Sequence, residues 1–266
     1  MAYNDIIVEK RGGIVVLNLN RPDRLNAVTW NTWAEIEDAV ERSAEDDEAR
    51  VIVISGNGRG FCSGTDLVVA ADQATPGRTV AGESRSERLR PRYASCAKLV
   101  ACPKPAIAAV NGIAAGAGLA LALACDIRIA GEEARFSAIW SRRALVPDFG
   151  CSYILPRIVG MAKALELMYS GDIIDAEEAL RIGLVSQVVP QDELMATALA
   201  LAERIAQGPP IAIELTKRLA YQPWREALEA QVQYEEHFQR FCAESEDARE
   251  GIQSFLEKRQ AEFKGR

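Results

Sequence analysis

The sequence predicts an α/β fold of repeated strand-strand-helix units, followed by an all-helical C-terminal part. Short β-branched runs at residues 51–54 and 105–110 are each followed by a glycine-containing turn. Helical patterns separate these runs, which is typical of parallel strands joined by crossover helices. From about residue 176 onward, only helical patterns occur.

The chain begins with a predicted β-hairpin. Two β-rich runs, 6–11 and 14–19, flank a glycine pair at 12–13, which favours a tight hairpin turn. A loop over 20–26 then leads into a helix. That helix carries apolar residues spaced for one face: Trp33, Ile36 and Val40. The run 51–54 predicts a buried strand that ends in a glycine loop.

The same order of elements returns further along the chain. A strand over 105–110 leads to a long uncharged apolar segment, 113–125. This segment is shorter than the roughly 20 residues that a membrane helix needs, so we expect it to contain a buried helix. Two further strands are predicted at 127–130 and 134–137.

Residues 70–92 break this rhythm with proline, glycine and serine, and they lack apolar periodicity. We therefore expect a mobile surface loop. It holds five arginines: Arg78, Arg85, Arg88, Arg90 and Arg92. We interpret them as solvated charges, with steering of an anionic substrate as the alternative.

The last third of the chain is predicted to be helical throughout. The expected helices cover residues 176–182, 192–207, 210–220, 224–242 and 245–260. One of them carries an apolar stripe made of Leu228, Val232, Phe238 and Phe241. Apolar faces on several helices suit packing between subunits as well as the protomer's own core.

Composition excludes several classes of protein. The chain has 266 residues, 48% of them hydrophobic, and a net charge of −7. This acidic balance disfavours binding to nucleic acid or to anionic membranes. The N-terminus lacks the basic and apolar stretches of a secretory signal, so we expect a cytoplasmic protein.

Cysteine and histidine usage argues against metal and triad chemistry. The six cysteines form no CxxC pair and no metal-binding spacing, so we interpret them as reduced thiols. The single histidine, His237, lies in an acidic helical stretch. HExxH zinc sites and Ser-His-Asp triads are therefore excluded, no metal site is expected, and His237 is predicted to lie on a helix face without a catalytic role.

Two glycine-rich segments, 61–67 and 111–119, stand at predicted strand-to-helix junctions. The start of a helix leaves unpaired N–H groups, so each junction offers backbone donors to an anion or a developing oxyanion. The alternative is that these glycines only permit tight turns and close packing. A dinucleotide-binding GxGxxG motif is disfavoured because Leu121 stands where its third glycine would be.

Three segments closely resemble the crotonase, or enoyl-CoA hydratase/isomerase, superfamily: residues 60–67 (GFCSGTDL), 103–112 (PKPAIAAVNG) and 116–118 (GAG). Further matches follow in order along the chain, at residues 20–22 (NRP), 126–130 (DIRIA), 183–190 (GLVSQVVP) and 250–259 (EGIQSFLEKR). Because these matches span essentially the whole chain, it is identified as a member of this superfamily.

The resemblance implies a crotonase-like spiral of ββα units over residues 1–200 and a helical oligomerisation region over 201–266. It also implies a homotrimer or a dimer of trimers. The substrate would be a coenzyme A thioester, with no separate cofactor. The backbone N–H groups of Thr65 and Ala117 would then form the oxyanion hole, which stabilises the enolate of the thioester.

The resemblance also identifies candidates for binding the substrate. Arg24 and Lys258 match the basic residues that meet the coenzyme's phosphates and adenine, with solvated surface charge as the alternative. The other residues of this binding surface would be Ala27, Ser63, Gly64, Asp66, Leu67, Gly116, Ala120, Trp140 and Phe255. For Asp66 itself, a helix N-cap or structural partner is favoured over a base.

The carboxylates decide which reaction is expected. Hydratases of the family hold water with two glutamates, and here those places are occupied by Ala120 and Trp140, which cannot transfer protons. Asp148 remains, at a spot where some isomerising members place a single acid-base residue. Such a lone base suits transfer of a proton from C2 to C4, which converts a 3-enoyl to a 2-enoyl thioester.

Several alternatives stay open at this point. Asp148 could instead be the N-cap of a helix that begins near Gly150, and Trp140 could be core packing or a wall of the acyl pocket. The pair, eight residues apart, also resembles aryl-CoA dehalogenases, although the histidine of that pattern is missing. An enoyl-CoA hydratase and a non-catalytic acyl-CoA-binding scaffold are the remaining alternatives to an isomerase.

Overall fold

A computed structural model of the protein describes residues 3–67 and 94–265. Its strands are β1 (Ile6–Arg11), β2 (Ile14–Leu19), β3 (Val51–Gly56), β4 (Gly60–Cys62), β5 (Ala106–Val110), β6 (Ile113–Ala115), β7 (Ile127–Gly131), β8 (Arg135–Ser137), β9 (Ile173–Asp175) and β10 (Gln187–Val189). Its helices are α1 (Trp30–Glu45), α4 (Ser95–Ala101), α5 (Ala117–Ala124), α6 (Cys151–Val159), α7 (Met161–Ser170), α8 (Ala176–Arg181), α9 (Leu194–Ala206), α10 (Pro210–Ala243) and α11 (Glu246–Leu256). Short 3-10 turns are η1 (Pro22–Arg24), η2 (Ile139–Arg143) and η3 (Gln191–Glu193).

The strands form two sheets. A six-stranded sheet has the order β1-β2-β3-β5-β7-β10, and a four-stranded sheet has the order β4-β6-β8-β9. The consecutive pairs β3/β4, β5/β6 and β7/β8 each give their first strand to the larger sheet and their second to the smaller one. This repeat confirms the predicted α/β fold of strand-strand-helix units.

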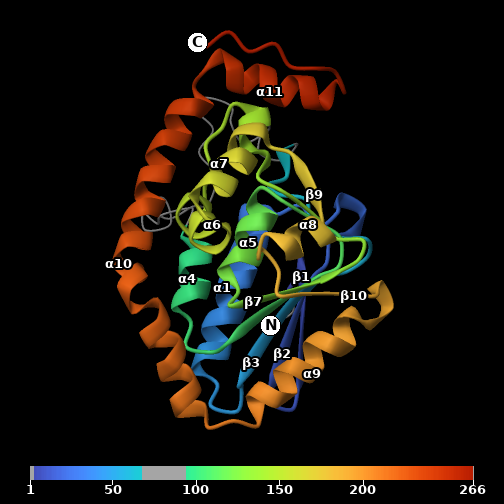
Figure 1. Cartoon of the computed structure of the whole chain (residues 1–266), viewed down its shortest axis with the longest axis vertical. Coiled ribbons are helices and arrows are strands. Elements are labelled where there is room, and N and C mark those ends of the chain that lie inside the picture. The colour runs from blue at the N-terminus through green and yellow to red at the C-terminus, as the bar shows by residue number, and fades with distance from the viewer. Residues whose placement is uncertain (1–2, 68–93, 266) are drawn as a thin grey trace.

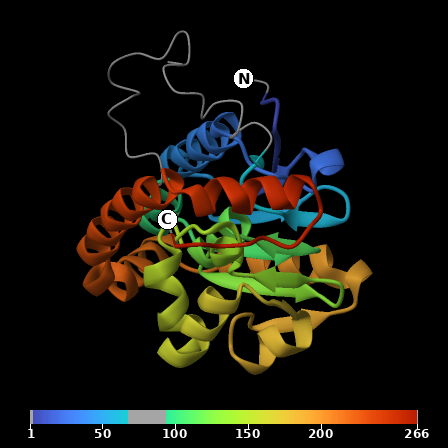
Figure 2. The same cartoon turned by 90° about the horizontal axis from the view of Figure 1, so that it is seen from above.

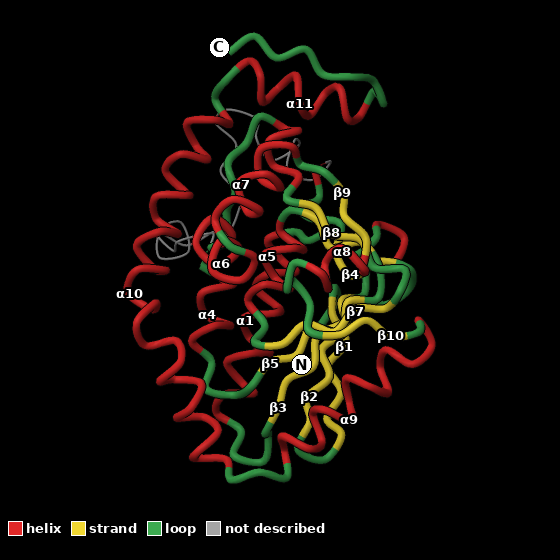
Figure 3. The backbone as a smooth tube through the Cα atoms, viewed as in Figure 1, coloured by secondary structure: helices red, strands yellow, loops and turns green. Residues whose placement is uncertain are grey.

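The larger sheet is buried on both faces, so its central strands β3 and β5 are mostly apolar. Ile52 and Ile54 of β3 point into a core shared with α1, α4 and α5. The alternate residues Val51 and Val53 point to the opposite face, which α9 covers. Figure 3 shows the strands between α9 on one side and α1, α4 and α5 on the other.

The C-terminal helices lie along the outside of this body. Helix α10 runs along one flank of the molecule, and α11 crosses its end (Figure 1). Seen from above, α11 crosses in front of the body of the molecule (Figure 2). Helix α11 packs on η2, with Gly251 against the backbone of Arg143.

The structure corrects three expectations about the last third. The segment after residue 176 is not purely helical, because β10 extends the larger sheet by pairing in parallel with β7. The two helices expected at 210–220 and 224–242 are one helix, α10, which continues through Pro223. The expected apolar stripe is also divided, because Leu228 and Val232 are buried whereas Phe238 and Phe241 are 52% and 75% exposed.

The structure also bears on the expectations about the cysteines, the loop at 70–92, the domain boundary, membrane helices and metal sites. All six cysteines are free thiols, as predicted. The loop expected at 70–92, with its five arginines, lies outside the described residues. Residue 200, proposed as the end of the spiral core, lies within α9. Within the described ranges, no helix is both long and apolar enough to cross a membrane, and no group of acidic, histidine or cysteine side chains is arranged to hold a metal ion.

Candidate active site

The turn that follows β4 lies against the loop that precedes α1. The Ser63 N–H donates to the Leu25 carbonyl at 3.0 Å, and the Val28 N–H donates to the Gly64 carbonyl at 2.8 Å. These bonds bring residues 24–28 and 63–66 together. Ala27 is buried within this arrangement, whereas Arg24 is exposed on η1.

The start of α5 packs against the same turn. Strands β4 and β6 pair in parallel and bring Cys62 opposite Ala114. Gly118 lies so close to β4 that a Cβ atom built there would stand 2.0 Å from the Cys62 carbonyl oxygen. A Cβ on Gly64 would lie 3.8 Å from the Ala117 nitrogen. The two glycine-rich segments therefore meet, and their glycines are needed for that close approach.

Two backbone donors are free at this junction. The bridge between Val28 and Thr65 uses the Gly64 carbonyl and the Asp66 N–H, and it leaves the Thr65 N–H without a partner among the described residues. Ala117 is the first residue of α5, so its N–H has no acceptor within the helix. These are the two donors predicted to form the oxyanion hole, and Ala120 follows one turn later, fully buried in α5.

Asp66 takes part in an ion pair. Its Oδ2 lies 2.9 Å from Nη2 of Arg21, and the same guanidinium donates to the Ala27 carbonyl. The carboxylate is buried, so this pair fastens the loop before α1 to the turn after β4. This arrangement agrees with a structural partner rather than a base.

Asp148 is buried in the loop between η2 and α6, with 4% of its surface exposed. Nε1 of Trp140 donates to its Oδ1 at 2.9 Å, and Nε2 of Gln239 donates to its Oδ2 at 3.0 Å. The N-cap alternative for Asp148 is wrong. Gly150 is the N-cap of α6, and the Asp148 side chain turns away from that helix toward Trp140 and α10.

The backbone next to Asp148 is unusual. Phe149 has a φ of 55° and Gly150 a φ of 82°, and a left-handed conformation is uncommon for a bulky residue such as phenylalanine. The Phe149 ring stacks on Trp33 of α1 with 4.6 Å between ring centroids, which holds the conformation in place. Strained residues of this kind cluster at functional sites.

Burial raises the pKa of Asp148 to about 8, and the nearby Glu235 carboxylate adds to the rise. The hydrogen bonds from Trp140 and Gln239 act in the opposite direction because they stabilise the ionised form. A pKa in this range suits a group that both takes and returns a proton near neutral pH.

Sequence reasoning missed two residues that surround Asp148, Glu235 and Gln239 of α10. Glu235 is 3% exposed and accepts from the Gly150 N–H at 2.6 Å, from the Ser152 N–H at 3.0 Å and from the Ser152 hydroxyl at 2.5 Å. It therefore caps α6 from another helix. The signal in the sequence is the four-residue spacing of Gln231, Glu235 and Gln239, which places all three on one face of a helix.

Other predicted binding residues lie further from this junction. Phe255 of α11 is about half exposed, and the Arg143 guanidinium lies 4.3 Å from its ring centroid. Lys258 is exposed just beyond the same helix. Since α11 packs on η2 and Phe255 contacts Arg143, Phe255 lies near the segment that carries Trp140. Leu67 is half-buried beside the described end of the turn.

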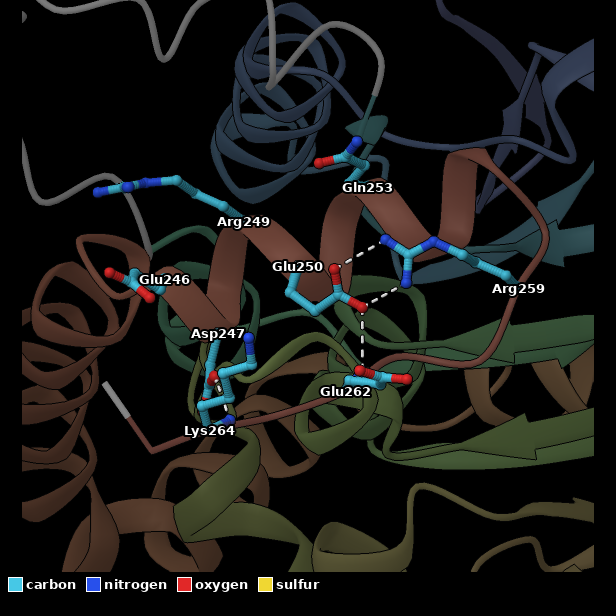
Figure 4. Close-up of a pocket in the computed structure, with 8 residues that line it drawn as sticks. All are labelled: Glu246, Asp247, Arg249, Glu250, Gln253, Arg259, Glu262 and Lys264. Carbon is cyan, nitrogen blue, oxygen red and sulfur yellow. Dashed lines mark hydrogen bonds and ion pairs between the residues drawn. The ribbon is translucent and has the colours of Figure 1, made fainter.

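A charged recess is present elsewhere, between α11 and the C-terminal segment. Its lining residues are Glu246, Asp247, Arg249, Glu250, Gln253, Arg259, Glu262 and Lys264. Arg259 forms an ion pair with Glu250 across it (Figure 4). None of the predicted site residues lines this recess, so it is not part of the candidate active site.

Comparisons with known proteins agree with this geometry. The family model described as enoyl-CoA hydratase/isomerase matches residues 9–266. The chain is 38% identical to 1,2-epoxyphenylacetyl-CoA isomerase from Escherichia coli K12 over 97% of both proteins. It is 40% identical to a probable enoyl-CoA hydratase from Rhodobacter capsulatus over the whole of both. A crystal structure of an enoyl-CoA hydratase/isomerase from Pseudoalteromonas atlantica superposes with a TM-score of 0.88, at 34% identity over 98% of this chain and 100% of the other.

Proposed function

The chain belongs to the enoyl-CoA hydratase/isomerase family, and on that premise we propose that it is an enoyl-CoA isomerase. Its substrate is a 3-enoyl-CoA thioester and its product is the conjugated 2-enoyl-CoA. The thioester is the substrate, and the reaction uses no separate cofactor. Arg24 and Lys258, both exposed cations, meet the anionic coenzyme.

The proposed reaction is a proton shuttle. The ionised Asp148 carboxylate takes a proton from C2 of the acyl chain, and the electron pair of the broken C–H bond moves into the thioester to form a dienolate. The N–H groups of Thr65 and Ala117 stabilise the negative oxygen. Asp148 then returns the proton at C4, so the double bond moves from C3 to C2 and no atom is gained or lost.

The observation that carries this proposal is the environment of Asp148. It is a buried carboxylate with a pKa near neutrality, and the two positions that hold the hydratase glutamates in the family carry Ala120 and Trp140. Glu235, the other carboxylate beside it, accepts three hydrogen bonds from the start of α6. Glu235 is thus occupied as a helix cap, which leaves one carboxylate for the chemistry and favours isomerisation over hydration.

The test follows the conjugated thioester by ultraviolet absorbance. We expect the protein to form conjugated product from a 3-enoyl-CoA and to leave a 2-enoyl-CoA unchanged. Replacement of Asp148 by Asn should lower the isomerisation rate by about 10²- to 10⁴-fold, the usual contribution of a general acid-base residue. Circular dichroism of the variant checks that it is folded.

Three other results would each contradict the proposed isomerase in a different way. Loss of absorbance from the 2-enoyl-CoA would indicate hydration, the activity named for the Rhodobacter capsulatus relative. Full isomerisation by Asp148→Asn would show that another group is the base. Tight binding of acyl-CoA without turnover of either substrate would instead support a non-catalytic scaffold.

A further inference from the structure

We propose that Gln239 and Glu235 of α10 are positioning residues for Asp148, so that α10 forms part of the acid-base machinery. Gln239 acts by direct hydrogen bonding, and Glu235 acts by fixing the start of α6 next to Asp148. The inference rests on the proposed function, because it assigns Asp148 as the proton-transfer group.

The first step concerns the hydrogen bonds that hold the Asp148 carboxylate. Trp140 donates to Oδ1 and Gln239 donates to Oδ2, so both oxygens are held and the plane of the carboxylate is fixed. The Gln239 amide is oriented in turn, because its Oε1 accepts from the Val146 N–H at 3.2 Å. An ionised carboxylate has about four lone-pair sites, so the two side-chain donors leave acceptor capacity on Asp148 for the substrate proton.

The second step concerns the loop that carries Asp148. Glu235 accepts hydrogen bonds from both sides of Cys151, at Gly150 and Ser152, and Gln231 donates to the Ser152 hydroxyl at 2.9 Å. One face of α10 thus clamps the chain on the C-terminal side of Asp148. Since Gln239 holds Val146 on the other side, the whole loop is fastened to α10.

The two α10 residues have opposite electrostatic effects on Asp148. A hydrogen bond donated by Gln239 favours the ionised carboxylate, whereas the charge of Glu235 disfavours it. The other titratable groups that face Asp148 are the thiols of Cys96 on α4 and Cys151 on α6, whose pKa values are raised far above their ordinary value by burial. They stay neutral near pH 8. Burial also raises the pKa of Glu235, whereas the hydrogen bonds from Ser152 and Gly150 lower it because they stabilise the ionised form.

The experiment measures the protonation of Asp148 directly. Infrared spectra recorded over a pH titration report the protonated carboxyl group, which is assigned as the band that disappears in Asp148→Asn. We expect Gln239→Leu to move the titration midpoint upward by about one to two pH units, since a hydrogen bond to a charged group contributes about 1.5–3 kcal/mol. Glu235→Gln should move it downward.

Two further variants complete the design. Gln239→Glu keeps the acceptor for Val146 but replaces the donor with an oxygen, so it should also move the midpoint upward. Gln233→Leu, at an exposed glutamine of the same helix, should leave it unchanged. If Glu235→Gln does not fold, the two Gln239 variants and the Gln233 control still decide the role of Gln239.

The outcomes separate this inference from the proposed function. An unchanged midpoint in both Gln239 variants, or a shift of the same sign in Gln239→Leu and Glu235→Gln, would overturn the positioning role. Opposite shifts in the midpoint together with full isomerisation by Asp148→Asn would support the positioning role and overturn Asp148 as the base. Opposite shifts that are matched by shifts in the pH dependence of isomerisation would support both.

Discussion

At the residue scale, the proposed chemistry depends on how one carboxylate is buried. Asp148 is withdrawn from water, which disfavours its charged form, but it keeps two hydrogen-bond donors, which favour it. The result is a pKa of about 8 rather than the much lower ordinary value of an aspartate. A carboxyl group with this pKa can hold a proton between the two steps of an isomerisation and release it again.

The pH dependence of the rate follows from the same group. A base must be ionised to take the substrate proton, so kcat/KM should rise about tenfold per pH unit below pH 8 and become constant above it. The measurement is kcat/KM for a 3-enoyl-CoA between pH 5 and about pH 10. An aspartate with an ordinary pKa would already be ionised at pH 5, so a kcat/KM that stays constant from pH 5 upward would contradict the assignment of the buried Asp148 as the base.

At the scale of elements, the site depends on the contact between β4 and the start of α5. Gly118→Ala would place a methyl group within 2.0 Å of the Cys62 carbonyl oxygen, so the first turn of α5 must move. We expect kcat to fall by about 10²- to 10³-fold, the cost of losing one oxyanion donor, and thermal stability to fall as well. Kinetics with a 3-enoyl-CoA and thermal unfolding provide the measurements.

The control for this prediction is another glycine-to-alanine change away from the site. At Gly13 a Cβ atom would meet mainly the side chain of Arg50, which is flexible. Gly13→Ala should therefore leave kcat close to that of the parent protein. Equal losses of kcat in both variants would show that the effect of Gly118→Ala is general destabilisation rather than displacement of the Ala117 N–H.

The elements also show what the sequence could and could not predict. The roles of the Thr65 and Ala117 donors and of the Asp148 carboxylate stay predictions, and the resemblance could supply them because each residue lies in a short contiguous motif. Gln239 was missed because it contacts Asp148 from 91 positions away in the chain, and no local pattern reports such a contact. The same holds for β10, whose three residues become a strand only because the edge of β7 is available to pair with them.

Helix α10 was misjudged for a different reason. Pro223 lacks an N–H group and is expected to end a helix, yet α10 continues through it. The helix is held by tertiary packing on both sides of the proline, with Lys217 buried before it and Leu228 buried after it. Such packing overrides the local tendency of proline to end a helix. It also divides the predicted apolar stripe, so that part of the stripe lies in the protomer's core and part on an outer face of α10.

At the scale of the whole molecule, apolar side chains gather on the outer surface of the C-terminal helices. Ile211, Leu219 and Phe241 of α10 are each more than 70% exposed, and Phe255 and Leu256 of α11 are about half exposed. Large contiguous apolar patches on a protein surface mark interaction sites. We therefore propose that these helices pack against further copies of the chain.

This proposal makes a defined prediction for the oligomeric state. Sedimentation analysis should give a species with three or six times the 29.0 kDa mass of one chain. The double variant Leu219→Glu and Phe241→Glu places charges in the contact, so it should shift the population toward monomer, whereas Gln233→Glu on the same helix should not. Glu235 and Gln239 lie on the inward side of α10, opposite Leu219 and Phe241. If α10 stays packed on its own chain when the subunits separate, the pH titration of Asp148 should therefore be unchanged. A parent protein that sediments as a monomer at micromolar concentration would overturn the proposal, and the exposed apolar face of α10 would then need a different partner.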